Sequence, residues 1–231
     1  MVLTGNTRAD KGYSVAKAEN KGSLLVVSAP SGAGKTSLCK GLLESFPGLR
    51  LSISYTTRPA RTGETDGVDY FFVTRDEFKK MVANGAFAEW AVVHGNCYGT
   101  AKDTLDSARQ RGANILLDID CQGAAQLKEN YGEGVFIFIL PPSLEELKKR
   151  LLGRKTDAPE VINTRIENAR REIAEASWYD YIIVNDDFSV ALEELKAIKL
   201  SEDCRSFRRC SFLKRFVDKE IDGKSPLEDN K

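Results

Sequence analysis

Residues 28 to 37 read Ser28-Ala29-Pro30-Ser31-Gly32-Ala33-Gly34-Lys35-Thr36-Ser37 and directly follow the apolar run Leu24-Leu25-Val26-Val27. An apolar strand, a glycine-rich turn and a helix start, in this order, are typical of a Walker A loop, whose backbone amides surround phosphate oxygens. In such a loop Lys35 reaches the β- and γ-phosphates and the Thr36 hydroxyl holds Mg²⁺. We therefore predict that residues 29–37 bind the phosphates of a nucleoside triphosphate.

One position departs from the usual pattern, because Ala29 stands where the first glycine is expected. Alanine fits there if the backbone keeps a negative φ, which the end of a strand allows. Gly32 and Gly34 are both present at the positions where backbone and phosphate approach most closely. The alternative, a chance glycine-rich turn, is disfavoured by the strand before the loop and the helical pattern after it.

Bulk composition describes a globular chain without a strong electric field. Its 231 residues suit one domain of moderate size with inserted subdomains, and 42% hydrophobic residues suffice for a core. Lys and Arg number 34, as do Asp and Glu, so no overall charge recruits nucleic acid or an acidic membrane. No apolar stretch approaches the roughly 18 residues of a membrane span. We expect neither nucleic acid nor a membrane as a partner.

Cysteine usage and the first residues bear on location. The five cysteines are odd in number and form no Cys-x-x-Cys pair, which favours reduced thiols in the cytoplasm over a disulfide framework or a zinc site. Residues 1–21 are polar and lack the apolar segment of a secretory signal. We interpret them as a disordered N-terminal tail.

Strand and helix patterns alternate after residue 22, which predicts an α/β fold with a parallel sheet flanked by helices. Residues 56–69 have loop chemistry, Gly95-Asn96 begins a turn, and Ser143 with Glu146 forms a capping box. The expected strands are 24–28, 49–54, 70–73, 87–93, 114–119, 135–140 and 181–184. The expected helices are 36–46, 74–81, 101–111, 143–152, 157–176 and 189–199.

A second motif is the apolar strand Asn114-Ile115-Leu116-Leu117-Asp118, which ends in an acid. Ligands of open α/β sheets bind at the carboxyl ends of the strands, so Asp118 or Asp120 would face the Mg²⁺ of a bound triphosphate. The alternative is an aspartate that caps a helix near Gln122-Gly123.

An arginine cluster lies in Ser54-Tyr55-Thr56-Thr57-Arg58-Pro59-Ala60-Arg61-Thr62-Gly63-Glu64. Arg58 and Arg61 are close enough to converge on one anion, and guanidinium groups bind phosphate through two parallel hydrogen bonds. Tyr70 and Tyr98 could add hydroxyl donors. The cluster predicts a second phosphate site, distinct from the Walker A loop.

Together with five further runs, these motifs resemble the guanylate kinase family over about residues 22–200. The further runs are Gly-Val-Asp-Tyr-Phe-Phe (67–72), Ala-Glu-Trp-Ala (88–91), Gly-Asn-Cys-Tyr-Gly-Thr (95–100), Leu-Asp-Ile-Asp-Cys-Gln-Gly (117–123) and Val-Asn-Asp-Asp (184–187). The resemblance implies ATP-dependent, Mg²⁺-supported phosphorylation of GMP and dGMP. It also implies a P-loop core (22–53, 101–149 and 178–200), an inserted GMP-binding subdomain (54–100) and a helical lid (150–177).

The resemblance also assigns roles to single residues. Arg58, Arg61, Tyr70 and Tyr98 resemble the grip on the GMP phosphate, and Glu89 and Thr100 the guanine readers, with Ser54 and Asp120 beside them. Arg150, Arg154 and Arg165 resemble lid arginines that act in catalysis with Lys35 and Arg58, and Asn185 resembles an adenine-side contact. Thr36 and Asp118 would hold the metal. Pro59-Ala60 reverses the usual order between the two arginines but keeps their spacing.

Several alternatives stay open at this point. Glu89 alternates with apolar neighbours, so it could lie on the solvent face of a strand. A binding module for phosphopeptides would keep the arginine and tyrosine site without catalysis, and another P-loop kinase would act on a different phosphorylated substrate. The extension 201–231 carries Arg205, Arg208, Arg209, Lys214 and Arg215, which favour a solvated helix face over contact with RNA or an acidic partner. Oligomeric state, including a homo-oligomer, is not indicated by the sequence.

Overall fold

The computed structural model describes residues 22–93, 95–153, 158–213 and 215. Its centre is a sheet of five parallel strands: β1 (Leu24–Ser28), β2 (Leu49–Leu51), β7 (Asn114–Asp118), β8 (Val135–Leu140) and β9 (Tyr181–Val184). The strand order is β2-β7-β1-β8-β9. The predicted α/β class and parallel sheet are therefore confirmed.

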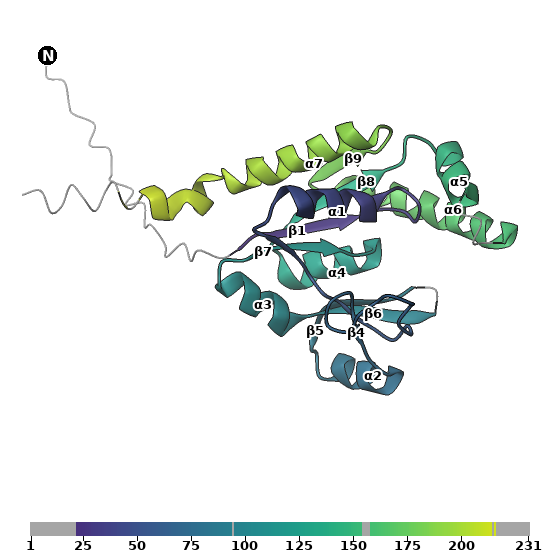
Figure 1. Cartoon of the computed structure of the whole chain (residues 1–231), viewed down its shortest axis with the longest axis horizontal. Coiled ribbons are helices and arrows are strands. Elements are labelled where there is room, and N and C mark those ends of the chain that lie inside the picture. The colour runs from purple at the N-terminus through teal and green to yellow at the C-terminus, as the bar shows by residue number, and fades with distance from the viewer. Residues whose placement is uncertain (1–21, 94, 154–157, 214, 216–231) are drawn as a thin grey trace, which may run out of the picture.

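Helices cover both faces of this sheet (Figure 1). Successive strand residues point to opposite faces, so Leu25 and Val27 join one core cluster while Leu24 and Val26 join the other. Helices α1 (Lys35–Ser45) and α7 (Phe188–Asp203) pack on the first face. Helices α3 (Lys102–Gln110) and α4 (Cys121–Tyr131) pack on the second. Burial on both faces explains why the strand sequences are continuously apolar.

The register of the central strands places the two nucleotide-binding motifs side by side. Val27 of β1 pairs with Asp118 of β7, one residue before the glycine-rich loop leaves the sheet. Parallel strands bring their carboxyl ends to one edge, so the loop and the acid share that edge.

A second, smaller sheet is inserted between β2 and α3. It contains β3 (Tyr55–Thr56), β4 (Phe71–Phe72), β5 (Phe87–Val93) and β6 (Asn96–Ala101) in the order β4-β3-β6-β5. Helix α2 (Arg75–Ala83) packs on it through Phe78, whose ring stacks on Phe87 with centroids 4.5 Å apart. Thr74 caps this helix in a capping box with Glu77.

Helix α4 links the small sheet to the central one. The Gln126 side chain accepts from the Trp90 N–H (3.1 Å) and donates to the Trp90 carbonyl (2.8 Å), while Asn130 donates to the Ala88 carbonyl (3.3 Å). β5 lies at the edge of its sheet. The two amide side chains therefore satisfy backbone groups that an edge strand leaves unpaired.

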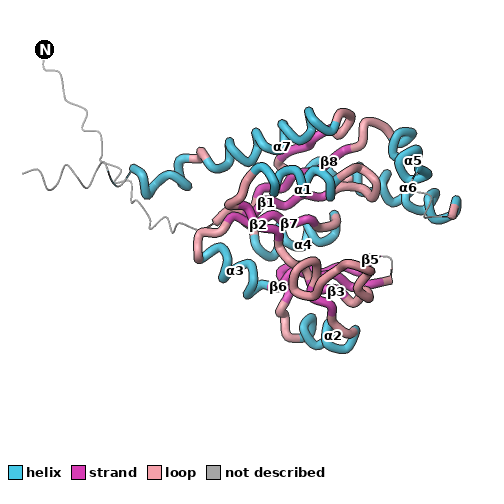
Figure 2. Tube along the Cα trace, viewed as in Figure 1, coloured by secondary structure: helices cyan, strands magenta, loops and turns pink. Residues whose placement is uncertain are grey.

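Helices α5 (Leu144–Gly153) and α6 (Pro159–Ala174) form a separate layer around Leu147, Leu151 and Ile162. The Ser143 hydroxyl accepts from the Glu146 N–H (3.0 Å), so the predicted cap is present, while the Glu146 carboxylate contacts Arg150. Secondary structure along the chain is coloured in Figure 2. In the described ranges, no helix has both the length and the apolar character needed to cross a bilayer.

Some sequence-based boundaries are wrong. The turn predicted at Gly95-Asn96 is present at Gly95, whose φ is 81°, but Asn96 already begins β6, which was not predicted. Helix α4 was absent from the expected helices and appeared only as the alternative of a helix-capping aspartate near Gln122-Gly123. The strand expected at 49–54 ends at Leu51, and the helix expected at 157–176 ends at Ala174, with a 3₁₀ turn, η1 (Ala176–Trp178), after it. The predicted disordered tail, residues 1–21, lies outside the described residues.

Candidate active site

The glycine-rich loop has the backbone that a phosphate cradle requires. Gly32 and Gly34 adopt φ values of 98° and 97°, a region that side chains disfavour. Helix α1 begins directly after the loop with no acid in its first turn and no side-chain cap, so its first N–H groups are available to an anion. A cavity of about 520 Å³ opens above this loop and is lined by Ala29 to Gly32 and Gly34 to Ser37.

Lys35 and Asp118 meet at the edge of the sheet. The Lys35 ammonium contacts the Asp118 carboxylate and donates to the Ile119 carbonyl (3.0 Å). Burial acts to lower the pKa of Lys35, but the Asp118 carboxylate outweighs it and the pKa is raised. Lys35 is therefore charged at neutral pH, and its contact with phosphate stays a prediction.

Asp120 serves as a helix cap, the alternative that the sequence left open. Its Oδ1 accepts from the Gly123 N–H (2.8 Å) at the start of α4. Asp120 also lines both cavities of the site. Of the two candidate acids, Asp118 is the one in contact with Lys35, and the guanine-side role of Asp120 stays a prediction.

The two expected guanine readers form a buried pair. The Thr100 hydroxyl donates to Glu89 Oε1 (2.6 Å), and Ser54 Oγ lies 3.5 Å from Thr100 Oγ1. Glu89 is only 4% exposed, so the solvent-face alternative is wrong. Burial raises the pKa of Glu89 to about 7, against the lowering effect of the Thr100 hydrogen bond.

A second cavity, of about 140 Å³, is lined by Ser54, Glu89 and Asp118. It shares Tyr70, Val93, Tyr98 and Asp120 with the cavity over the loop. The rings of Tyr70 and Tyr98 meet edge to face with centroids 6.0 Å apart, so both predicted tyrosines lie where the two cavities join. The site thus has one polar end at the loop and another at Glu89.

The two predicted phosphate-binding arginines are held by a residue that sequence reasoning did not assign to the site. Glu64 accepts two hydrogen bonds from the Arg58 guanidinium (2.8 and 2.9 Å) and one from the Arg61 N–H (2.7 Å). The guanidinium carbon of Arg58 lies 5.4 Å from the centre of the Tyr70 ring. Glu64 therefore orients Arg58 beside a residue of the cavity, while Arg61 is exposed.

Helix α6 contributes the far wall. Arg165 donates to the Ser31 hydroxyl of the loop (3.3 Å), and Asn168 and Glu172 line the same cavity. Burial raises the pKa of Glu172 to about 7, helped by the nearby Asp120 carboxylate. Asn168 and Glu172 were missed, although their spacing of three and seven residues from Arg165 places all three on one helical face.

Of the other two predicted lid arginines, the structure describes Arg150 only. Arg150 donates to the Asn185 carbonyl (3.1 Å) and to Glu146 (3.3 Å), so it connects α5 to the segment after β9. Arg154 lies outside the described residues. Catalytic roles for both stay predictions.

Asn185 supports the loop from behind. Its Nδ2 donates to the Ala33 carbonyl (2.7 Å), and a Cβ placed on Gly34 would lie 2.3 Å from the same nitrogen. Asn185 is buried at 5% exposure. Its amide thus holds the loop conformation, and the adenine-side contact stays a prediction.

Three features together define a P-loop kinase. They are a phosphate-binding loop after the first strand of a parallel sheet, an acid on the neighbouring strand, and an inserted sheet with a second polar site. The family model for guanylate kinase matches residues 21–202. The chain is 61% identical to a guanylate kinase of Syntrophotalea carbinolica over 90% of this chain and 100% of that protein. It is 59% identical to a guanylate kinase of Geobacter metallireducens over 82% of this chain and 94% of that protein.

Among solved structures, a guanylate kinase from Anaplasma phagocytophilum matches with a TM-score of 0.67 and 37% identity, over 82% of this chain and 90% of that one. The chain belongs to the guanylate kinase family. The resemblance inferred from the motifs is thereby confirmed, and the chain is an enzyme of the phosphotransferase class rather than a phosphopeptide-binding module.

Proposed function

We propose that this enzyme transfers the γ-phosphoryl group of ATP to GMP and dGMP, giving GDP or dGDP and ADP in purine nucleotide metabolism and GMP recycling. The observation that carries the proposal is the buried Glu89, which accepts from Thr100 and lines a cavity that shares four residues with the one above the glycine-rich loop. An ionised carboxylate accepts from both N1–H and the 2-amino group of guanine. The Thr100 hydroxyl has one hydrogen, which it donates to Glu89 in the unliganded enzyme, so it would have to rotate to donate to the guanine carbonyl.

Reaction at this site requires alignment more than acid–base chemistry. The attacking group is a phosphate oxygen of GMP, whose second pKa of about 6 leaves it mostly dianionic at neutral pH. Lys35, on the triphosphate, and Arg58, on the GMP phosphate, place positive charge where negative charge develops. Arg165, bound to Ser31 of the loop, would supply a third cation from α6.

Thr36 and Asp118 would hold the Mg²⁺ that accompanies ATP. Both carry hard oxygen donors, and Asp118 lies beside Lys35 at the loop. In the described part of the chain no three His, Cys, Asp or Glu residues gather as a metal cage. That pattern fits Mg²⁺, which takes one or two protein ligands and completes its shell with phosphate and water. When bound, the ion neutralises charge on the phosphates.

The experiment is a coupled ADP-release assay with GMP, dGMP, AMP, CMP and UMP at equal concentrations. We expect turnover with the two guanine nucleotides and little with the others. Preference for another nucleotide, or for none, would refute the assignment of Glu89 and Thr100 while leaving the P-loop kinase class intact.

We further propose a cytoplasmic location, which the five unpaired cysteines support. Small-molecule substrates are the expected partners, without nucleic acid or membrane.

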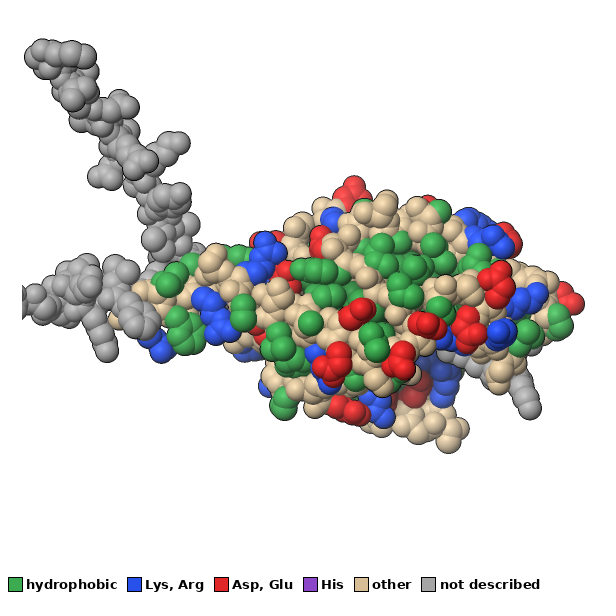
Figure 3. Space-filling view, turned by 90° about the horizontal axis from the view of Figure 1, so that it is seen from above, with side chains coloured by type: hydrophobic (Ala, Val, Ile, Leu, Met, Phe, Trp, Pro, Cys, Tyr) green, Lys and Arg blue, Asp and Glu red, His purple; other side chains and the backbone are tan. Residues whose placement is uncertain are grey.

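A homo-oligomer stays a hypothesis. The edge strand β9 exposes Ile182 and Val184, and hydrophobic side chains gather over this side of the molecule in Figure 3. Light scattering at several protein concentrations would decide it.

A further inference from the structure

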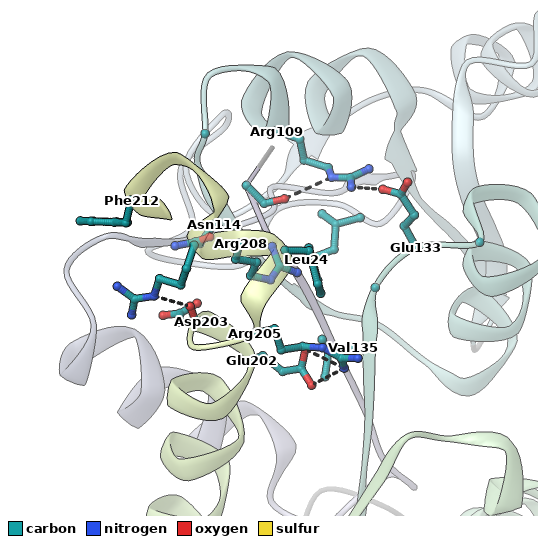
Figure 4. Close-up of a pocket in the computed structure, with 16 residues that line it drawn as sticks. Leu24, Arg109, Asn114, Glu133, Val135, Glu202, Asp203, Arg205, Arg208 and Phe212 are labelled. Atoms are coloured by element: carbon teal, nitrogen blue, oxygen red, sulfur yellow. Dashed lines mark hydrogen bonds and ion pairs between the residues drawn. The ribbon is translucent and has the colours of Figure 1, made fainter. Parts of the chain in front are cut away.

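A cavity of about 700 Å³ lies at the opposite end of the central sheet from the candidate active site. Its floor contains Leu24, Asn114 and Val135, the first residues of β1, β7 and β8, whereas the active site lies at the last residues of these strands. The other wall is the segment after α7, with Phe207, Arg208 and Phe212 (Figure 4). This wall begins beyond residue 202, where the family model ends.

Charged side chains dominate the lining, but most of them neutralise one another. Each of the three acids has a cation as partner. Glu133 contacts Arg109, Glu202 accepts from Arg205 (3.2 Å), and Asp203 contacts Lys199. The charged lining residues are Arg109, Glu133, Glu202, Asp203, Arg205, Arg208 and Arg209. After this pairing two guanidinium groups, those of Arg208 and Arg209, have no carboxylate of their own among the described residues of the range 22–213.

Arg208 is the less satisfied of the two. In the described part of the chain its Nε is buried without a hydrogen-bond partner, and its guanidinium carbon lies 5.0 Å from the centre of the Phe207 ring. Figure 4 shows it inside the cavity, between Asn114 and Leu24. Burial lowers the pKa of Arg208, although Glu202 and Asp203 act in the opposite direction. A buried guanidinium is costly unless an acceptor pairs with it.

Arg209 has a partly satisfied guanidinium. Its Nε donates to the Asp203 carbonyl (3.0 Å), and no ion pair with a described residue is formed. Phe207 and Phe212 flank the two arginines and are 53% and 49% exposed. Basic and hydrophobic side chains alternate over this end of the molecule in Figure 3. The predicted solvated helix face is therefore wrong for Arg208, which is half-buried in a cavity wall.

We propose that this cavity is an oxyanion site that binds a phosphate group on Arg208 and Arg209. A phosphate offers several acceptor oxygens to two guanidinium groups and would pair the Arg208 nitrogen that is otherwise unsatisfied. Phe207 and Phe212 would contact the less polar part of a phosphorylated ligand. The site is independent of the nucleotide site, because the two lie at opposite ends of the same strands.

The competing occupant is the acidic end of the same chain. Residues 216–231 lie outside the described residues and include Asp218, Glu220 and Asp222. Carboxylates from this segment could neutralise the same arginines. A full-length variant with Asp218→Asn, Glu220→Gln and Asp222→Asn distinguishes this occupant from an external phosphate.

The test is an amide NMR titration of the full-length chain with inorganic phosphate at constant ionic strength. We expect two separate sets of shifts, one at Gly32 and Gly34 of the loop and one at Gly112, Gly132 and Gly134 beside the cavity. Arg208→Gln should weaken the second set about 10-fold or more and leave the first unchanged. Arg208→Lys should restore part of the affinity, and Lys79→Gln, which removes a charge on the exposed side of α2, should change neither set.

Three outcomes would overturn the proposal. The first is the absence of shifts beside the cavity in both the wild type and the acid-neutralised variant. The second is binding beside the cavity that is the same in the wild type and in Arg208→Gln. The third is binding that appears only after the acids of residues 218–222 are neutralised, which would make the chain's own end the occupant. None of these outcomes bears on the shifts at the loop, so they leave the proposed kinase function untouched.

Discussion

Glu89 is the residue that we propose reads the base, and its burial would make that recognition sensitive to pH. Its pKa in the folded protein is about 7, above the ordinary value for glutamate. Because the folded state then holds a proton that the unfolded state has released, this group's contribution to stability falls as pH rises from the unfolded pKa of about 4.3 to about 7. Guanine would bind the ionised form of Glu89, so affinity for GMP should rise with pH while this contribution to stability falls.

We predict that GMP binds more tightly to the wild type as pH rises from about 6 to about 8, and that Glu89→Gln loses the part of this change that comes from Glu89. The GMP phosphate titrates in the same range, but it does so for both proteins. The ratio of the two dissociation constants, measured by calorimetry, therefore isolates Glu89 and should grow about 10-fold over this interval. A ratio that does not vary with pH would show that Glu89 does not ionise against guanine.

We propose that Lys35 and Arg58 belong to two separate phosphate sites, and two substitutions can test this. Lys35→Ala should lower kcat by about 100-fold or more, since a cation at the transferring phosphate is lost, and should leave the Kd of GMP nearly unchanged. Arg58→Ala should weaken GMP binding by roughly 1.5–3 kcal/mol, the contribution of a charged hydrogen bond. Calorimetry with GMP in the absence of ATP measures the Kd of GMP for both variants. Equal losses of GMP affinity in both variants would contradict the two-site assignment.

At the scale of elements, α4 fixes the position of the Glu89 carboxylate, the proposed base reader. A Cβ on Gly123 would lie 2.4 Å from Glu89 Oε2 and 3.2 Å from Asp120 Oδ1. Two more α4 side chains, Gln126 and Asn130, bind the backbone on either side of Glu89. Gly123 leaves the space that the carboxylate occupies, so this helix face determines where the Glu89 carboxylate lies.

Gly123→Ala should therefore reduce base selectivity without unfolding the protein. Alanine in a helix is favoured over glycine by roughly 1 kcal/mol, which offsets part of the crowding. We expect the kcat/KM ratio of GMP to IMP, which lacks the 2-amino group, to fall at least about 10-fold. Gly48→Ala is the matched control, because nothing lies within 4 Å of its added Cβ. If both variants kept the wild-type ratio, α4 would have no part in selectivity.

Elements with a strong local signal were predictable from the sequence. Strands 87–93, 135–140 and 181–184 match the structure at both ends, because unbroken or alternating apolar runs are bounded by turn residues. β6 was missed because Gly95-Asn96 and the polar run after it look like a turn, while its pairing with β5 supplies the stability. Glu64, Asn168 and Glu172 were not among the predicted site residues, since only tertiary contacts bring them beside residues that were.

At the scale of the whole molecule, three bodies of the fold contribute to the candidate site, and the small sheet packs on α4 through Ala88 and the backbone of Trp90. The loop belongs to the central sheet, Glu89 and Thr100 to the small sheet, and Arg165 to α6. Kinases exclude water by closing such bodies around both substrates. The pairing of Gln126 with Trp90 joins the small sheet to α4 and would remain in place during closure, so we expect the small sheet to pivot about this joint.

A bisubstrate analogue that links adenosine and guanosine through phosphates should therefore make the enzyme more compact in solution scattering. Amide hydrogen exchange would locate the motion. Protection should increase over residues 58–70, which approach the GMP phosphate, while the Trp90 amide, already bonded to Gln126, should exchange at the same rate with and without the analogue. Unchanged dimensions on binding would contradict closure. A large gain of protection at Trp90 would place the pivot elsewhere, because the joint would then have been open in the unliganded enzyme.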